Sequence, residues 1–155
     1  SEGVYGSPSV AAIGVACHEA GHAYQHAASY PWLTLRSAIV PFVRIGSNFG
    51  VVLFMVGMIL ASMIGTFGLT IAWIGIALFG LTTVFTLITL PVEFNASNRA
   101  KQWIAQTGVF SAEEQKGISE ILGAAALTYV AAALQSFANL LYYINILSGD
   151  RRRRY

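Results

Sequence analysis

The chain has 155 residues, of which 55% are hydrophobic and only 10% are charged, and its mean hydropathy is +0.61. An average soluble domain is about 25% charged, so this composition excludes an ordinary soluble protein and indicates a single membrane-embedded unit. Four of the nine Lys and Arg residues fall in residues 151–154, and no basic stripe with interleaved aromatic residues points to a nucleic-acid partner. We therefore expect an all-α membrane protein.

The first expected helix covers residues 8–28. Ser7 is the candidate N-cap of this helix, and Pro8 suits its first turn. The helix contains the pattern H-E-x-x-H at residues 18–22. This pattern is typical of zinc-dependent hydrolases, so the helix is the first place to look for chemistry.

His18 and His22 lie four residues apart and therefore on the same face of the helix. Both imidazoles can reach one metal ion, and zinc suits them because a catalytic zinc needs only three protein ligands. Glu19 is the candidate general base for a water that the metal activates. The alternative is a chance match on a polar helix. All three histidines of the chain lie within residues 16–28, which favours the metal site.

Two further residues of this helix are candidates for the site. His26 follows His22 on the same face, but it lies about 12 Å along the helix axis from His18, which is too far to share one ion. A supporting or substrate-facing role for His26 stays open beside an ordinary interfacial histidine. Cys17 is expected in the core, because its side chain points to a different face from that of His18. Metal ligation is the alternative for this thiol.

An uncharged stretch separates Arg44 from Glu93. Since a membrane-spanning helix needs about 20 apolar residues, we expect a transmembrane hairpin of residues 49–64 and 69–90, with its break at residues 65–68. Small residues at intervals of four favour close packing of the two spans. They are Gly57, Ala61 and Gly65 in the first span, and Gly68 and Ala72 in the second.

The segment before the hairpin, residues 32–48, has two interpretations. It forms either an amphipathic segment at the membrane surface, anchored by Trp32, or a loop packed over the metal site.

After the hairpin, residues 91–106 are expected to form a helix that begins at Pro91 and ends before Gly108. Two spans return the chain to the side of the membrane that holds the histidines, so Glu93 is available as a third zinc ligand. The alternative is a glutamate that the macrodipole favours at a helix start. A third span, residues 118–147, completes the expected fold.

With these residues in hand, the chain resembles the YugP-like zinc-dependent membrane metallopeptidases, a group of bacterial neutral zinc metallopeptidases of the H-E-x-x-H zincin type. The resemblance covers nearly the whole sequence. It rests on four motifs in order, namely GVACHEAGHA at residues 14–23, LRSAIVP at 35–41, LPVEFNAS at 90–97 and AAALTYVAAA at 124–133. The resemblance implies zinc held by His18 and His22, and Glu19 as the catalytic base.

The segment around Glu93 is also similar to that of the HtpX-like membrane proteases, in which a glutamate ligand precedes an Ala-Asp pair. Carried onto this chain, that ligand is Glu93. The chain departs from the pattern with Ser97 in place of the aspartate, so a carboxylate that would orient a ligand is missing. Family members carry an upstream membrane helix, and related zinc peptidases hold substrate against an edge strand. We therefore expect this chain to be a fragment that lacks both.

The residues and the resemblance together predict a zinc-dependent endopeptidase of the bacterial cell membrane that cleaves peptides or membrane-associated proteins. Candidates for supporting the ligands or stabilising the oxyanion are His26, Tyr24, Arg99 and Tyr129. The alternatives are a non-catalytic membrane protein with a structural zinc site or a regulatory role, and an intramembrane-cleaving protease. Basic residues leave the side of the membrane undecided, with a slight preference for a cytoplasmic active site.

Overall fold

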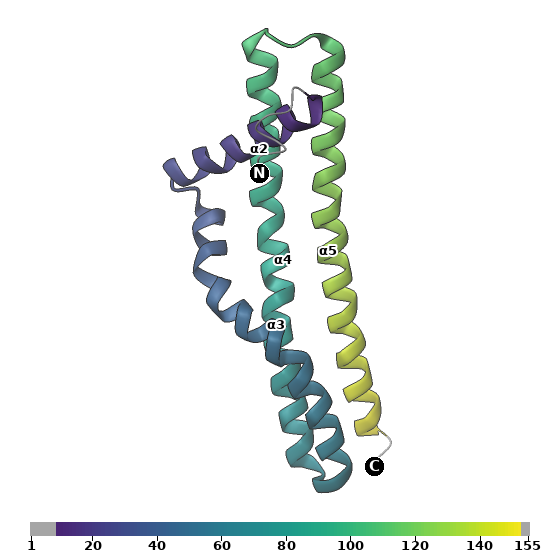
Figure 1. Ribbon diagram of the computed structural model, residues 1–155. Coiled ribbons are helices and arrows are strands. Elements are labelled where there is room, and N and C mark those ends of the chain that lie inside the picture. The colour runs from purple at the N-terminus through teal and green to yellow at the C-terminus, as the bar shows by residue number, and fades with distance from the viewer. Residues whose placement is uncertain (1–8, 153–155) are drawn as a thin grey trace. The chain divides into compact units, whose positions relative to one another are not determined.

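The computed structural model describes residues 9–152, which fold into helices α2 (Val10–Ala27), α3 (Pro31–Ile64), α4 (Thr66–Thr107) and α5 (Ala112–Arg152) (Figure 1). No strand occurs within the described range. The expected all-α membrane architecture is therefore confirmed. Three helices, α3, α4 and α5, are long and apolar enough to cross a membrane, because a span needs only about 20 residues.

The first helix begins slightly later than expected. The side chain of Ser9 accepts a hydrogen bond from the backbone N–H of Ala12 at 3.2 Å, which makes Ser9 the N-cap of α2. Ser7 and Pro8, which we expected as the cap and the first turn, lie outside the described residues. The helix ends at Ala27, close to the expected limit.

Two expected breaks are absent from the described helices. Residues 32–48 are not a loop, because α3 begins at Pro31 and continues without interruption through Pro41 and into the first expected span. Likewise α4 continues through Pro91, so residues 69–90 and 91–106 belong to one helix. A proline removes one helical hydrogen bond. In an apolar environment the remaining backbone groups have no water to bind, and this favours continuing the helix.

The turn between α3 and α4 is a single residue. Gly65 has a φ of +62°, a conformation that favours glycine, and joins Ile64 to Thr66. The expected break at residues 65–68 is therefore shorter than predicted, and Gly68 lies inside α4.

The described residues divide into two compact units. The first, here called the α2 unit, contains α2, the start of α3 to Leu35, α4 from Ile88 and α5 to Ala131. The second, here called the hairpin unit, contains the remaining parts of α3, α4 and α5, from Arg36 to Leu87 and from Ala132 onward.

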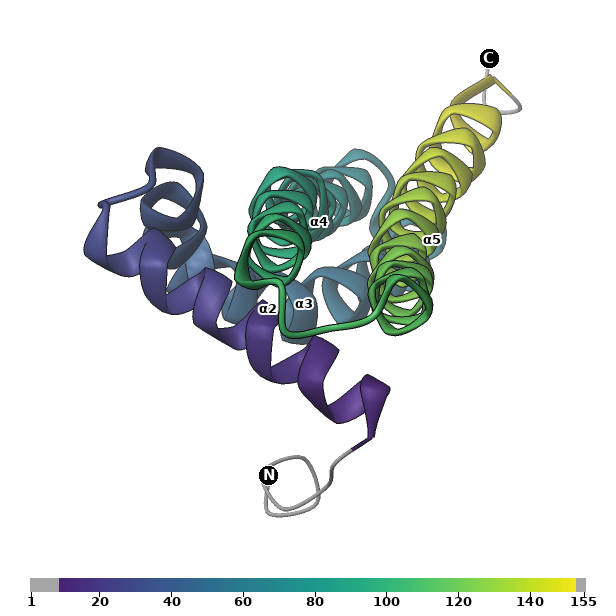
Figure 2. The ribbon, with the colours of Figure 1, turned by 90° about the horizontal axis from the view of Figure 1, so that it is seen from above.

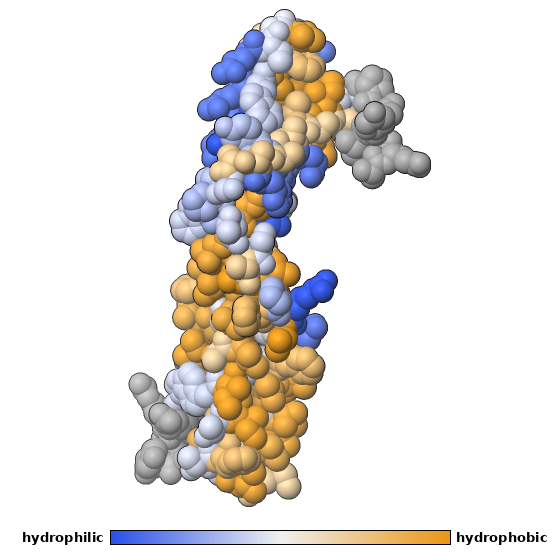
Figure 3. All heavy atoms as spheres, turned by 90° about the vertical axis from the view of Figure 1, so that its left-hand side faces the viewer, coloured by the Kyte–Doolittle hydropathy of each residue, from blue (hydrophilic) through white to orange (hydrophobic). Residues whose placement is uncertain are grey.

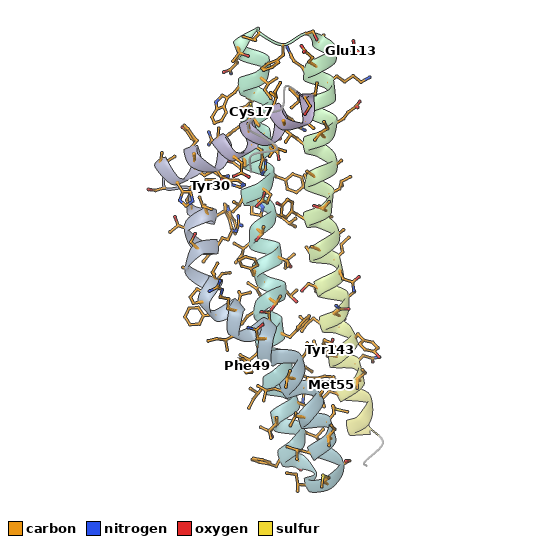
Figure 4. All side chains as sticks on the ribbon, viewed as in Figure 1. Cys17, Tyr30, Phe49, Met55, Glu113 and Tyr143 are labelled. Atoms are coloured by element: carbon orange, nitrogen blue, oxygen red, sulfur yellow. The ribbon has the colours of Figure 1, made fainter. Side chains whose placement is uncertain are left out.

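Within the α2 unit, α2 lies across the C-terminal part of α4 and the N-terminal part of α5 (Figures 1 and 2). The core of this unit consists of Ala100, Ile104, Ile118 and Leu122, and the apolar side of α2 packs against it. Cys17 belongs to that apolar side, as expected (Figure 4). Burial raises the pKa of its thiol and keeps it protonated, which disfavours metal ligation.

The hairpin unit is held by small residues at the contact of α3 and α4. A Cβ added at Gly57 would lie 2.3 Å from the backbone N of Ala72, and one added at Gly68 would lie 2.1 Å from that of Ala61. The predicted close packing through these four residues is confirmed, whereas Gly65 serves as the turn. Tyr143 of α5 completes the unit by packing its ring on two phenylalanine rings, with centroids 4.8 and 5.4 Å away.

The surface of the hairpin unit is mainly apolar, with a few exposed polar side chains such as Arg44 and Asn48. Figure 3 shows a mostly hydrophobic face over this unit, interrupted by a few hydrophilic patches, and Figure 4 labels Phe49 and Met55, which are each 55% exposed on α3. Contiguous exposed apolar surface on this scale is uncommon in soluble proteins. It suits contact with lipid tails.

Candidate metal centre

Three expected residues meet inside the α2 unit. His18 and His22 come from α2 and Glu93 comes from α4, and their ligand atoms all lie within 4.8 Å of one another. The Nε2 atoms of the two histidines are 3.1 Å apart, and Glu93 Oε2 lies 3.2 Å from His18 Nε2 and 3.4 Å from His22 Nε2. Two imidazole nitrogens and a carboxylate oxygen therefore converge on one point.

These separations fit a tetrahedral zinc ion. With zinc–ligand bonds of about 2.0–2.1 Å, the ligand atoms of a tetrahedral site lie about 3.3–3.4 Å apart. The three separations here are 3.1, 3.2 and 3.4 Å. Nitrogen and carboxylate oxygen are ligand types that zinc accepts, and three protein ligands are the number found in catalytic zinc sites.

The motif helix can approach α4 because of Gly21, which lies between Glu19 and His22. A Cβ at this position would lie 2.7 Å from the carbonyl oxygen of Ala96 and 3.0 Å from its Cα. Both atoms are backbone and cannot rotate away. A glycine inside the motif therefore brings the histidines to the level of Glu93.

Each histidine is also contacted at its second ring nitrogen. Ser97 Oγ lies 3.0 Å from His18 Nδ1, and Gln25 Oε1 lies 3.0 Å from His22 Nδ1. The supporting position that the sequence left in doubt is thus filled by the hydroxyl of Ser97. A hydroxyl can donate or accept a hydrogen bond, so it can serve either tautomer of His18.

Gln25 and Asn95 are polar neighbours that the sequence analysis did not single out. Gln25 is fully buried, and its Nε2 donates to Val92 O at 2.8 Å and to Asn95 Oδ1 at 3.1 Å. Its spacing of three residues from His22 is the one sequence signal that could have indicated it, because residues three apart share a helix face.

The electrostatics of the centre are governed by a buried carboxylate. Glu93 is only 3% exposed. The hydrogen bond with Glu93 is the largest cause that raises the pKa of His22, burial of the ring opposes it, and the hydrogen bond to Gln25 and the charges of Glu93 and Glu19 add to the increase. Protonation of the His22 ring therefore competes with the binding of a metal cation.

The remaining candidates come from α2, α4 and α5. Glu19 is exposed on α2, and its negative charge contributes to the raised pKa of His22. His26 is exposed in the last turn of α2, and Tyr129 is half-buried on α5. Tyr24 and Arg99 contact each other, with the guanidinium carbon of Arg99 4.2 Å from the centre of the tyrosine ring.

Comparison with known proteins reveals the family. Residues 1–148 match the family described as "Putative neutral zinc metallopeptidase". This chain belongs to that family.

This chain is 48% identical over 151 residues to the protein named "Putative membrane protease YugP" of Bacillus subtilis (strain 168). The match covers 97% of this chain and 64% of the relative, so the chain spans slightly less than two thirds of that relative's length. No solved structure matches this chain. The family implies zinc, and the name of the relative together with the three candidate spans supports a membrane protein.

Proposed function

We propose that this chain is the catalytic part of a membrane-embedded zinc endopeptidase, with His18, His22 and Glu93 as zinc ligands and Glu19 as the general base. The observation that carries the proposal is the triangle of donor atoms, whose sides of 3.1, 3.2 and 3.4 Å suit a tetrahedral ion. In the pattern H-E-x-x-H, Glu19 directly follows His18, the first of the proposed ligands, in the sequence.

Glu19 and Glu93 have different surroundings, which suits different roles. Glu93 is buried against both histidines and is suited to hold a cation. Glu19 is exposed, so its carboxylate can take a proton from the attacking water and deliver it to the leaving amine. When bound, zinc would supply Lewis-acid activation of the scissile carbonyl and of that water.

Arg99 is our choice among the candidates for stabilising the oxyanion. Its Nε donates to Asn95 Oδ1 at 2.9 Å, and its guanidinium rests on the ring of Tyr24. A cation that is already oriented costs no reorganisation when negative charge develops on the substrate. We assign His26 and Tyr129 no part in zinc binding.

The second candidate function is a non-catalytic membrane protein with a structural zinc site or a regulatory role. A structural zinc site usually has four protein ligands. The group of donors found among residues 9–149 has three members, and this favours the catalytic proposal. A fourth protein ligand to zinc would favour the structural role.

The printed name of the relative suggests a protease that acts at a membrane. We accordingly propose membrane-associated proteins as substrates and the bacterial cell membrane as the location.

Metal content tests the ligand set. We expect about one zinc per chain in the purified wild type, and strong loss of zinc in His22→Ala and in Glu93→Ala. His26→Ala is the matched control, because it removes an exposed histidine from the same helix and should keep its zinc. Zinc retained in Glu93→Ala would remove Glu93 from the site.

Catalysis is tested separately with Glu19→Gln. We expect this variant to bind zinc as the wild type does and to lose hydrolysis of a fluorescent casein by a factor of at least about 100, in line with the general-base contribution of 10²–10⁴. Glu120→Gln, an exposed glutamate on α5, is the control and should remain active. Activity retained in Glu19→Gln would end the proposed mechanism.

A further inference from the structure

One amide side chain of the α2 unit, that of Gln25, is fully buried. Gln25 is 0% exposed and makes three polar contacts, one with His22 and two with atoms of α4. A buried polar side chain is costly unless its hydrogen-bonding groups are satisfied. These contacts must therefore agree on which end of the amide is the donor.

The contacts with α4 settle the orientation of this amide. The carbonyl oxygen of Val92 can only accept a hydrogen bond, so the Gln25 atom at 2.8 Å from it must be the NH₂ group. Asn95 Oδ1 accepts at 3.1 Å from the same nitrogen and also accepts from Arg99 Nε at 2.9 Å. Because Arg99 is always a donor, it fixes the orientation of the Asn95 amide as well.

An oriented amide presents its oxygen to His22. Gln25 Oε1 is an acceptor only, and it lies 3.0 Å from His22 Nδ1. The hydrogen bond therefore requires a hydrogen on Nδ1, and in the neutral ring this leaves Nε2 with its lone pair. That lone pair faces the point where His18 Nε2 and Glu93 Oε2 converge.

We propose that Gln25 is a positioning residue that holds His22 in the tautomer with hydrogen on Nδ1, so that Nε2 is presented to the metal. The consequence for zinc rests on the proposed function, whereas the tautomer itself is a property of the metal-free chain. His18 differs in this respect, because the hydroxyl of Ser97 at its Nδ1 accepts either tautomer. The network thus acts on one histidine of the pair.

Without Gln25, a competing arrangement becomes available. A neutral His22 with hydrogen on Nε2 can donate to Glu93 Oε2, which lies 3.4 Å away. This arrangement uses the metal-binding nitrogen and must be broken before zinc can bind. Removing partners that orient a ligand typically costs 10–100-fold in metal affinity.

The tautomer can be measured directly by nitrogen NMR of the chain labelled with ¹⁵N-histidine, in detergent micelles, without metal and at alkaline pH. The chain has only three histidines, so the spectrum is simple to assign with single histidine variants. We expect hydrogen on Nδ1 of His22 in the wild type. Hydrogen on Nε2 instead would overturn the proposal, and this measurement requires no change at Gln25.

Variants at Gln25 give the second test. We expect Gln25→Leu, which has no acceptor, to move His22 toward the other tautomer and to weaken zinc binding by about 10–100-fold in a chelator competition assay. Gln25→Glu keeps an oxygen that can accept from Nδ1 even when the carboxyl is ionised at the alkaline pH of the NMR experiment. This conservative variant should retain the wild-type tautomer and bind zinc within about threefold of the wild type.

Gln115→Leu is the matched control, because it removes a similar amide that donates to the carbonyl oxygen of Phe110 at 2.9 Å in the same unit. It should change neither the tautomer nor the zinc affinity. An equal loss of affinity in Gln115→Leu, or an unchanged tautomer in Gln25→Leu, would overturn the proposal. The wild-type tautomer together with absence of zinc binding would instead count against the proposed function alone.

Discussion

Gly21→Ala is the substitution whose effect follows most directly from the packing of α2. The added Cβ would lie 2.7 Å from Ala96 O, about 0.7 Å closer than ordinary van der Waals contact at 3.4 Å. The opposing atoms are backbone, so α2 must move away from α4 by a similar distance. Metal sites tolerate errors of only about 0.2 Å in ligand distances, and the histidines and Glu93 lie on opposite sides of this contact.

The expected loss can be estimated from overpacking, which typically costs about 1–3 kcal/mol. If this strain appears in zinc binding, affinity falls by about 5–150-fold, since 1.4 kcal/mol is a factor of ten. Alanine also favours a helix over glycine by about 0.5–1 kcal/mol, so thermal stability is the less informative measurement. Zinc affinity should be measured by competition with a chelator of known affinity.

Gly14→Ala is the matched control on the same helix. Its added Cβ would lie 3.3 Å from Cγ2 of Ile118, a side-chain atom that can yield. We expect zinc affinity within about threefold of the wild type for this control. Wild-type affinity in Gly21→Ala would refute the argument that this glycine sets the distance between α2 and α4.

Three further predictions follow from contacts described above. Ser97→Ala removes the hydroxyl 3.0 Å from His18 Nδ1 and should weaken zinc binding by about 10-fold, as measured by chelator competition. Gly57→Ala puts a Cβ 2.3 Å from the backbone N of Ala72 and should lower the free energy of unfolding by about 1–3 kcal/mol in detergent. Gly80→Ala is the control and should not lower the free energy of unfolding, because its added Cβ would meet open space. Equal effects of these two glycine variants would contradict the packing argument. Removal of zinc by a chelator should abolish hydrolysis. It should leave the helical circular dichroism unchanged, because the core of the α2 unit is apolar. Loss of helicity would point to a structural zinc.

The sequence alone predicted much of this site because its main signals are local. The helical repeat determines that His18 and His22 share a face. Counting two spans between the histidines and Glu93 was enough to predict that the glutamate is available, and the structure brings the three side chains together. The close contact of α3 and α4 was equally predictable from the small residues, since helices can approach closely only where side chains are short.

The parts that the sequence did not predict depend on environment and on tertiary contacts. Pro91 was expected to begin a helix, and Pro41 falls in the segment expected to precede the first span, but both prolines lie inside long apolar helices. The contacts of Gln25 with Val92 and Asn95 join residues about 70 positions apart. No periodicity reports such pairs, and the role of Ser97 was missed because the resemblance pointed to a carboxylate.

The separation of the donors along the chain has a consequence for biosynthesis. His18 and Glu93 are 75 positions apart, and all of α3 and the first part of α4 lie between them. During translation the histidine pair therefore exists well before its carboxylate partner emerges from the ribosome. If the three donors bind zinc as proposed, metal acquisition requires Glu93 as well as the histidines, so it would report that α4 has been made and that α2 has packed against it.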